Sequence, residues 1–106
     1  MEAATDASPL RSGDLEIRPA EFTAIAGDRP LNLTARELDL LTALVVREGR
    51  IVSREELYRT VWGERYRKSD RSVDVYVARL RHKLEEALPG RRFIHTHFDF
   101  GYRFQP

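Results

Sequence analysis

The chain has 106 residues, enough for one domain with a single hydrophobic core and too few for two. Hydrophobic residues make up 42% of the sequence and charged residues 33%, which excludes a chain too polar to fold. Cysteine is absent, which excludes disulfides, thiolate zinc sites and cysteine nucleophiles. No apolar run approaches the roughly 20 residues of a membrane span, and no signal peptide is recognisable, so we expect a cytoplasmic protein without a membrane partner.

The positive charge is concentrated in one part of the chain. The net charge is only +1, but residues 65–92 carry nine cations and four anions, while the remainder has four more anions than cations. Sixteen of the 18 cations are arginine, whose guanidinium group binds phosphates and base edges through paired hydrogen bonds. This asymmetry indicates a surface that meets a polyanion, and the alternative is a solvated surface with uneven charge.

The N-terminal part predicts a leader and a small sheet. Residues 1–13 are small and polar without periodicity, so we expect a disordered leader, followed by a folded domain over residues 14–106. Apolar and charged residues alternate over residues 15–18, and further strands are expected at residues 22–26 and 30–33. Three short strands in succession predict an antiparallel sheet.

Two hydroxyl caps predict the first two helices. Thr34 and Glu37 have the spacing of a capping box, in which hydroxyl and carboxylate each accept a backbone amide at the helix N-terminus. An apolar face then repeats with helical period up to Gly49, formed by Leu38, Leu41, Leu44 and Val45. Ser53 and Glu56 repeat the cap spacing ahead of a shorter second helix.

A third helix, expected over residues 70–87 with Ser69 or Asp70 as its cap, has the most informative pattern. Its apolar residues fall on one narrow stripe: Val73, Val77, Leu80 and Leu84. The opposite side and its flank carry Arg71, Ser72, Val75, Tyr76, Ala78, Arg79, His82 and Lys83. One face is therefore expected to pack against the core, and the other to remain free to bind.

The end of the chain predicts a β-hairpin. Residues 93–96 and 102–104 are candidate strands on either side of residues 97–101. An N-terminal antiparallel sheet, three helices and a C-terminal hairpin, in that order, predict an α+β fold, the winged helix-turn-helix, with the hairpin as its wing.

Several short strings, in register, resemble the effector domain of OmpR/PhoB-type response regulators over residues 14–105. They are Leu33-Thr34 with Glu37-Leu38, residues 52–57, Val61-Trp62-Gly63, residues 71–75, Arg79-Leu80-Arg81 with Lys83-Leu84, and Gly101-Tyr102-Arg103-Phe104. The resemblance implies a four-stranded N-terminal sheet, with the fourth strand expected near residues 50–52, and a third helix that lies in the major groove of duplex DNA. Response regulators carry a receiver domain ahead of this one, so the chain is either an excised effector domain or a stand-alone regulator.

The resemblance also implies a set of DNA contacts. Arg79 would read a base, since its planar guanidinium can donate two hydrogen bonds to guanine. The alternative is a solvated arginine or a surface ion pair with Asp74 or Glu86. Backbone phosphates would be contacted by Arg71, Ser72, Tyr76 and Arg81 and, through their ring donors, by Trp62 and Tyr102. The other DNA contacts that the resemblance implies are Val75, Lys83, Thr96 and Phe98. Trp62 has the alternative of an aromatic cover over the end of the second helix.

The wing and one loop leave alternatives open. Phe98 and Asp99 stand where the family usually carries an arginine, which enters the minor groove, and a glycine. Strand alternation would put Phe98 and Phe100 on the same side, so we expect both to pack against the hairpin, with binding of a partner as the alternative. A basic loop matches the segment that contacts RNA polymerase in activators of the family, and the alternative is a flexible loop beside DNA; it comprises Glu64, Arg65, Tyr66, Arg67 and Lys68.

The sequence therefore predicts sequence-specific binding of double-stranded DNA by a bacterial transcriptional regulator, as tandem copies on adjacent half-sites. A winged-helix protein-interaction module with weak or non-specific DNA binding is the second hypothesis, which the altered wing favours. An enzyme is not expected, because the sequence has no glycine-rich phosphate loop, activated serine or metal-spaced histidines. We likewise expect no metal, cofactor or small-molecule substrate.

Overall fold

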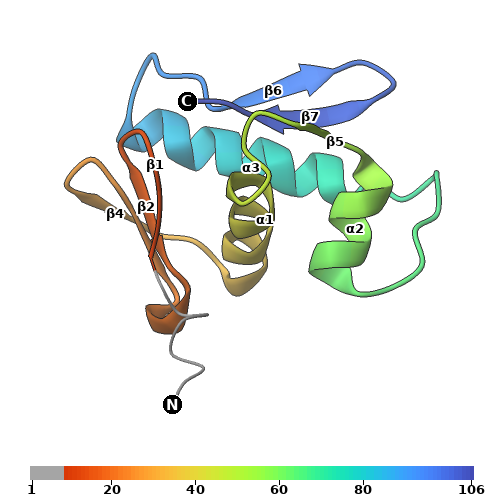
Figure 1. Ribbon diagram of the computed structural model, residues 1–106, viewed down its shortest axis with the longest axis horizontal. Helices are drawn as coiled ribbons and strands as arrows, with labels where there is room; N and C mark the ends of the chain where they lie inside the picture. The colour runs from red at the N-terminus through yellow and green to blue at the C-terminus, as the bar shows by residue number, and fades with distance from the viewer. Residues whose placement is uncertain (1–8) are drawn as a thin grey trace.

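Two antiparallel sheets flank three helices in the computed structural model, which describes residues 9–106 (Figure 1). The first sheet contains β1 (Leu10–Ser12), β2 (Leu15–Arg18), β3 (Thr23–Ala26) and β4 (Arg29–Leu31) in that order. The helices are α1 (Ala35–Val45), α2 (Arg54–Trp62) and α3 (Ser72–Ala87). The second sheet, ordered β5-β7-β6, contains β5 (Ile51–Val52), β6 (Ile94–His97) and β7 (Gly101–Phe104). The predicted α+β class is confirmed.

The prediction of a leader over residues 1–13 needs correction at its C-terminal end. Residues 10–12 form β1, which pairs with β2 in the register Leu10 to Ile17 and Ser12 to Leu15. This pairing satisfies the backbone groups of a segment too short to show a period of its own. Residues 1–8 of the predicted leader lie outside the described residues.

The fourth strand of the N-terminal sheet is β1, so its expected place near residues 50–52 is wrong. Residues 51–52 do form a strand, β5, but this strand pairs with β7 of the hairpin, where Ile51 faces Arg103 and Val52 faces Tyr102. The wing is therefore a three-stranded sheet connected to the start of α2.

The core lies where α1 and α3 meet the two sheets. All four residues of the predicted apolar stripe of α3 are buried, as are Leu38, Leu41, Leu44 and Val45 of α1. Figure 1 shows the four-stranded sheet beside the C-terminal end of α3, α2 beside its N-terminal end, and the β6–β7 hairpin running along it. This burial confirms the face of α3 that the sequence predicts to pack.

The capping box at the start of α1 is confirmed. The Thr34 hydroxyl accepts a hydrogen bond from the Glu37 amide at 3.2 Å, and the Glu37 carboxylate accepts one from the Thr34 amide at 2.9 Å. The same buried carboxylate also accepts a hydrogen bond from Lys83 Nζ of α3 at 2.6 Å. One cap thus connects the first and third helices.

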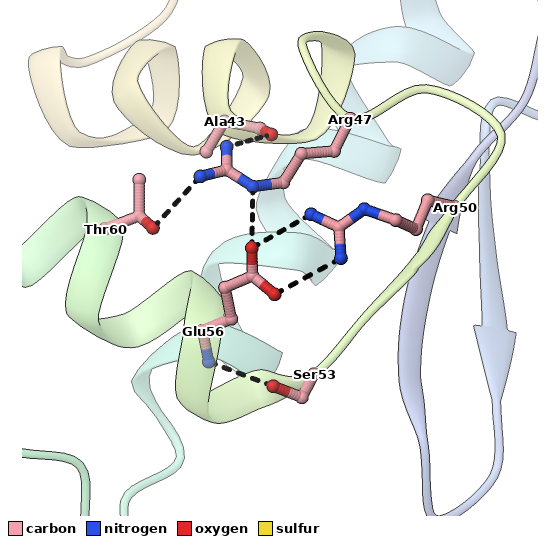
Figure 2. Close-up of polar contacts among 6 residues, drawn as sticks. All are labelled: Ala43, Arg47, Arg50, Ser53, Glu56 and Thr60. Carbon is pink, nitrogen blue, oxygen red and sulfur yellow. Dashed lines mark hydrogen bonds and ion pairs between the residues drawn. The ribbon is translucent and has the colours of Figure 1, made fainter.

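The cap of α2 follows only half of the predicted pattern. The Ser53 hydroxyl accepts a hydrogen bond from the Glu56 amide at 3.0 Å, as expected. The Glu56 carboxylate does not return to the cap: it accepts hydrogen bonds from Arg47 Nε and Arg50 Nη2, each at 3.0 Å (Figure 2). Two guanidinium groups are stronger partners for a carboxylate than one neutral amide, and they hold the start of α2 against the end of α1.

The expected packing of Phe98 and Phe100 against the hairpin is wrong. Their side chains are 87% and 70% exposed. Both lie in the turn between β6 and β7, where Asp99 has a left-handed φ of 67° and the Phe100 amide donates to the His97 carbonyl at 3.0 Å. Side chains alternate between faces only within a strand, so the rule does not apply to this turn.

Candidate nucleic-acid interface

One face of α3 is exposed. Arg71, Val75, Ala78, Arg79 and His82 are all exposed, on the side opposite the buried stripe. This is the outward face that the helical period predicts.

Arg79 lies over the ring of Tyr76, one turn earlier on α3, at 4.8 Å from the guanidinium carbon to the ring centroid. Neither carboxylate named as an alternative partner is engaged with it, because Asp74 pairs with Arg54 and Glu86 with His82. The guanidinium of Arg79 is therefore supported from the side by an aromatic face and keeps its donors open to a ligand.

A row of aromatic rings supports Tyr76 from behind. Tyr76 meets the ring of Trp62 edge-on with centroids 5.5 Å apart, and Trp62 stacks on Tyr58 at 5.1 Å. Tyr58 in turn contacts Tyr66 of the basic loop at 5.6 Å. Trp62 is thus an aromatic cover over the end of α2, the alternative considered for it, and it connects this helix to the outward face of α3.

The first turn of α3 is held by Asp70. Its carboxylate accepts a hydrogen bond from the Ser72 amide at 2.8 Å, and the hydrogen bonds from Ser72 keep the pKa of Asp70 below its ordinary value. Arg71 stands beside this turn with its side chain 81% exposed, 3.9 Å from the Asp74 carboxylate. The N-cap position itself is Arg71, which makes no side-chain cap hydrogen bond, so the expected cap at Ser69 or Asp70 is wrong. The start of the helix presents an amide bound to Asp70 and an accessible guanidinium side by side.

Asp74 joins α2, α3 and the wing. Its carboxylate accepts hydrogen bonds from Arg54 Nε at 2.7 Å and from the hydroxyl of Tyr102. Burial by itself would raise the pKa of Asp74, but these two hydrogen bonds outweigh it, and the net pKa lies below the ordinary value. The hydroxyl of Tyr102, predicted to contact a phosphate, is thus already donated within the protein.

Two further predicted contact residues of α3 are engaged inside the protein. Arg81 donates from Nη2 to the Ile94 carbonyl at 2.8 Å and to the Thr96 hydroxyl at 2.7 Å, which ties α3 to β6. Lys83 donates to the Asn32 carbonyl at 2.7 Å as well as to Glu37. The acceptors of Arg81 are neutral, so they do not compensate its charge, whereas the charge of Lys83 faces a carboxylate.

The basic loop at residues 64–68 is exposed except at one side chain. Arg65, Arg67 and Lys68 are exposed, and Tyr66 is partly buried by its contact with Tyr58. The loop follows α2 and leads into α3, so it lies beside the N-terminal end of α3 (Figure 1).

The structure brings most of the predicted contact residues to one side of α3, and it adds supporting residues that the sequence reasoning missed. These are Arg36, Arg54 and Tyr58. The guanidinium carbon of Arg36 lies 5.2 Å from the Trp62 ring centroid. The four-residue spacing of Tyr58 and Trp62 on one helix is a signal that could have predicted their contact. The contacts of Arg36 and Arg54 join distant segments and leave no local signal.

Metal and membrane sites are not found in residues 9–106. This part of the chain has no group of three or more histidine, aspartate or glutamate side chains placed to hold a metal ion. It also has no helix that is long and apolar enough to cross a bilayer.

Comparison of the sequence with known proteins gives matches over most of the chain. The family model described as "Transcriptional regulatory protein, C terminal" matches residues 28–104. The response regulator MprA of Mycolicibacterium vanbaalenii is 34% identical over 102 residues, which are 95% of this chain and 43% of that protein. The phosphate regulon transcriptional regulatory protein PhoB of Escherichia coli is 38% identical over 92 residues, covering 85% of this chain and 39% of PhoB. The chain thus spans less than half the length of these relatives.

Solved structures share the fold over nearly the whole chain. The DNA-binding domain of Klebsiella pneumoniae RstA, in complex with the RstA box, has a TM-score of 0.84 and 32% identity, covering 93% of this chain and 98% of that one. The DNA-binding domain of CpxR from Escherichia coli has a TM-score of 0.83 and 31% identity, covering 92% and 96%. The predicted winged-helix architecture is thereby confirmed.

Proposed function

This chain belongs to the family of C-terminal domains of transcriptional regulatory proteins, the family of OmpR/PhoB-type response regulators that its motifs resemble, and on that premise we propose that it binds double-stranded DNA with sequence specificity. In this proposal α3 lies in the major groove, and the chain acts in a bacterial transcriptional regulator without catalysis or cofactor. The observation that carries the proposal is the outward face of α3, where Arg71 and Arg79 stay exposed while the opposite stripe is buried. The bound RstA box of the similar RstA domain supports it.

Arg79 is the proposed base-reading residue. A guanidinium fork donates two hydrogen bonds to N7 and O6 of guanine, which is worth about 1–3 kcal/mol of discrimination against other bases. The stacking of Arg79 on Tyr76 supports this role because it limits the orientations of a long side chain before DNA is bound. Val75, which is 45% exposed on the same face, is suited to contact a thymine methyl group.

The start of α3 is the proposed phosphate-binding end. Arg71 supplies an exposed charge, and Ser72 and Tyr76 supply hydroxyl groups on the flank of the helix. Contacts of this kind set the position of the protein on the duplex and carry no sequence information directly. Each phosphate neutralised is expected to add about −0.9 to the slope of log affinity against log salt concentration.

Tyr102, Trp62, Arg81 and Thr96 have supporting roles in the proposal. Tyr102 and Arg81 hold the wing against α3, through Asp74 and through Thr96 respectively, so a phosphate at the wing would meet groups whose positions are already set. Lys83 is left out of the proposed contacts, because its ammonium group is bound to the buried Glu37 carboxylate.

Two protein partners follow from the same proposal. The exposed cations of residues 64–68 are proposed to contact RNA polymerase, beside the DNA. A second copy of the chain is proposed to occupy an adjacent half-site about one helical turn away, which places both recognition helices on one face of the duplex. The proposed DNA-binding domain begins at Leu10, with β1. Its proposed location is the cytoplasm.

A protein-interaction module is the second candidate function. It is favoured by the exposure of Phe98 and Phe100 at the tip of the wing, since exposed aromatic rings on a short turn resemble a docking surface more than a phosphate contact. Asp99 between them adds a negative charge that phosphates repel.

Selection of bound duplexes from a random pool, followed by titration of the enriched duplex at two salt concentrations, tests the proposal. We expect a defined sequence to be enriched, and an affinity that falls steeply as salt is raised. Enrichment of no sequence, together with an affinity as weak as that of a scrambled duplex, contradicts the proposal and favours the second candidate.

A further inference from the structure

The C-terminal half of α3, the loop after it and strand β6 enclose a groove of about 720 Å³. Two residues of its lining, Arg81 and Thr96, belong to the DNA contacts that the resemblance implies, whereas Arg92 does not. The lining contains three arginines and, among the described residues, a single carboxylate: Arg81, Arg91, Arg92 and Glu85.

Two of the three arginines keep a charge that no carboxylate cancels. In residues 9–106 no aspartate or glutamate oxygen lies within 4 Å of the guanidinium nitrogens of Arg81 or Arg92, whereas Arg91 pairs with Asp14 at 2.6 Å. The Glu85 carboxylate accepts a hydrogen bond from the amide of Gly90 at 3.1 Å and does not pair with either one. The groove therefore has two uncompensated positive charges on its wall.

Arg81 is already held in position. Its Nε and Nη2 donate to the Ile94 carbonyl at 3.2 and 2.8 Å, and Nη2 also donates to the Thr96 hydroxyl at 2.7 Å. These acceptors are neutral, and Nη1 has no hydrogen-bond partner in the described part of the chain. An arginine fixed in this way loses little conformational entropy when it binds a ligand.

We infer that this groove is a binding site for a phosphate group, with Arg81 and Arg92 as its ligands. Guanidinium groups bind phosphate oxygens through paired, charge-assisted hydrogen bonds. A cleft lined by charges of one sign also concentrates the field and attracts an anion of the opposite sign. No function assigned to the outward face of α3 uses Arg92.

Two sources supply this chemistry. One is the backbone of a duplex that continues past the C-terminal end of α3, and this source rests on the proposed function. The other is a free phosphate or phosphate ester, which does not depend on DNA binding. The groove and the outward face share α3, and both include His82.

The first experiment titrates the isotope-labelled chain with inorganic phosphate and then pyrophosphate at constant ionic strength, and follows backbone amides by NMR. Saturable shifts are expected at Gly90, Ile94 and Thr96. Arg92→Ala is expected to weaken binding about tenfold, the effect of losing one charge-assisted contact. Arg29→Ala, which removes an equally exposed arginine from β4, is the matched control and is expected to change the affinity little.

The second experiment compares a duplex that covers only the selected site with one extended by about ten base pairs, one helical turn, at each end. If DNA is the source, Arg92→Ala weakens binding of the long duplex and leaves the short one unchanged. If a free phosphate is the source, only the first experiment responds to Arg92→Ala.

Weaker binding by Arg92→Ala in either experiment supports the phosphate site. If Arg92→Ala binds as the parent does in both experiments, the phosphate site is overturned. Equal losses in Arg92→Ala and Arg29→Ala also overturn it, because they indicate a general charge effect. Failure to bind any duplex refutes the proposed function. The phosphate titration alone then decides whether the groove binds phosphate.

Discussion

The hydroxyl of Tyr102, on the last strand of the wing, donates a hydrogen bond to the carboxylate of Asp74 in the first turn of α3. The Tyr102 side chain is buried, and the guanidinium carbons of Arg54 and Arg81 lie 4.9 and 5.6 Å from the centroid of its ring. This contact fixes the wing relative to the helix that we propose to enter the major groove.

Tyr102→Phe keeps the ring and removes only this hydrogen bond. We expect a loss of about 1–2 kcal/mol in the free energy of unfolding, because the partly buried Asp74 carboxylate loses a donor that burial makes hard to replace. Urea denaturation measures this loss in the free energy of unfolding. The same substitution in an Asp74→Ala background is expected to cost much less, and equal costs in the two backgrounds would show that the hydroxyl does not act through Asp74.

Glu37 makes the stability depend on pH. Burial alone would raise the pKa of this carboxyl, but hydrogen bonds from Lys83 and Thr34 outweigh it, so the folded-state pKa lies below the ordinary value. The stabilisation is therefore complete above the ordinary pKa of about 4.3 and is lost as the pH falls through the lowered, folded-state pKa.

Urea unfolding between pH 7 and pH 3 tests this dependence. The parent is expected to keep its stability down to about pH 5 and to lose it below about pH 4. Glu37→Gln is expected to be less stable at neutral pH. It is also expected to lose less stability on acidification, because the glutamine side chain does not titrate. Parallel curves for the two proteins would assign the acid sensitivity to other carboxyl groups.

Phe98 and Phe104 lie on the same hairpin but differ in burial, with exposed fractions of 87% and 0%. Phe98→Ala is expected to change the free energy of unfolding by less than about 0.5 kcal/mol, the usual range for exposed positions. Phe104→Ala is expected to cost about 3–5 kcal/mol, because it removes a buried ring that stacks on Phe93. Thermal unfolding distinguishes them, and a large loss for Phe98→Ala would contradict the exposed position of that ring.

Gly101 has no room for a side chain. A Cβ at this position would lie 2.0 Å from the backbone oxygen of Val52, at a φ of 135°. Gly101→Ala is therefore expected to displace β5 from β7 and to lower the stability by several times the effect of Gly63→Ala. Gly63 also has a positive φ, 73°, but a Cβ there meets nothing within 4 Å, so only a backbone cost of about 1 kcal/mol is expected. Similar melting temperatures for the two variants would contradict this close approach.

Sequence patterns predicted the elements that carry their own local signal. The stripe of α3 repeats over about three turns, and the Thr34 cap is complete within four residues, so both were predicted correctly. Strand β1 was missed because it has only three residues and is defined by its pairing with β2.

The candidate interface was predictable to the same extent. The exposure of Arg71 and Arg79 follows from the helical period, which the sequence displays. The engagement of Lys83 with Glu37, 46 residues away, and of Tyr102 with Asp74, 28 residues away, depends on tertiary packing. Phe98 and Phe100 were expected to pack because the alternation rule of strands was applied to residues that the sequence already placed between two strands.

The most direct measurement of the central claim is the affinity of the parent chain, Arg79→Ala and Arg29→Ala for the selected duplex and for the same duplex with its contacted guanine replaced. We predict that the parent and Arg29→Ala prefer the selected duplex, and that Arg79→Ala loses about 1–3 kcal/mol of this preference, or about 5- to 150-fold. An unchanged preference in Arg79→Ala would contradict the claim that the outward face of α3 reads the DNA sequence.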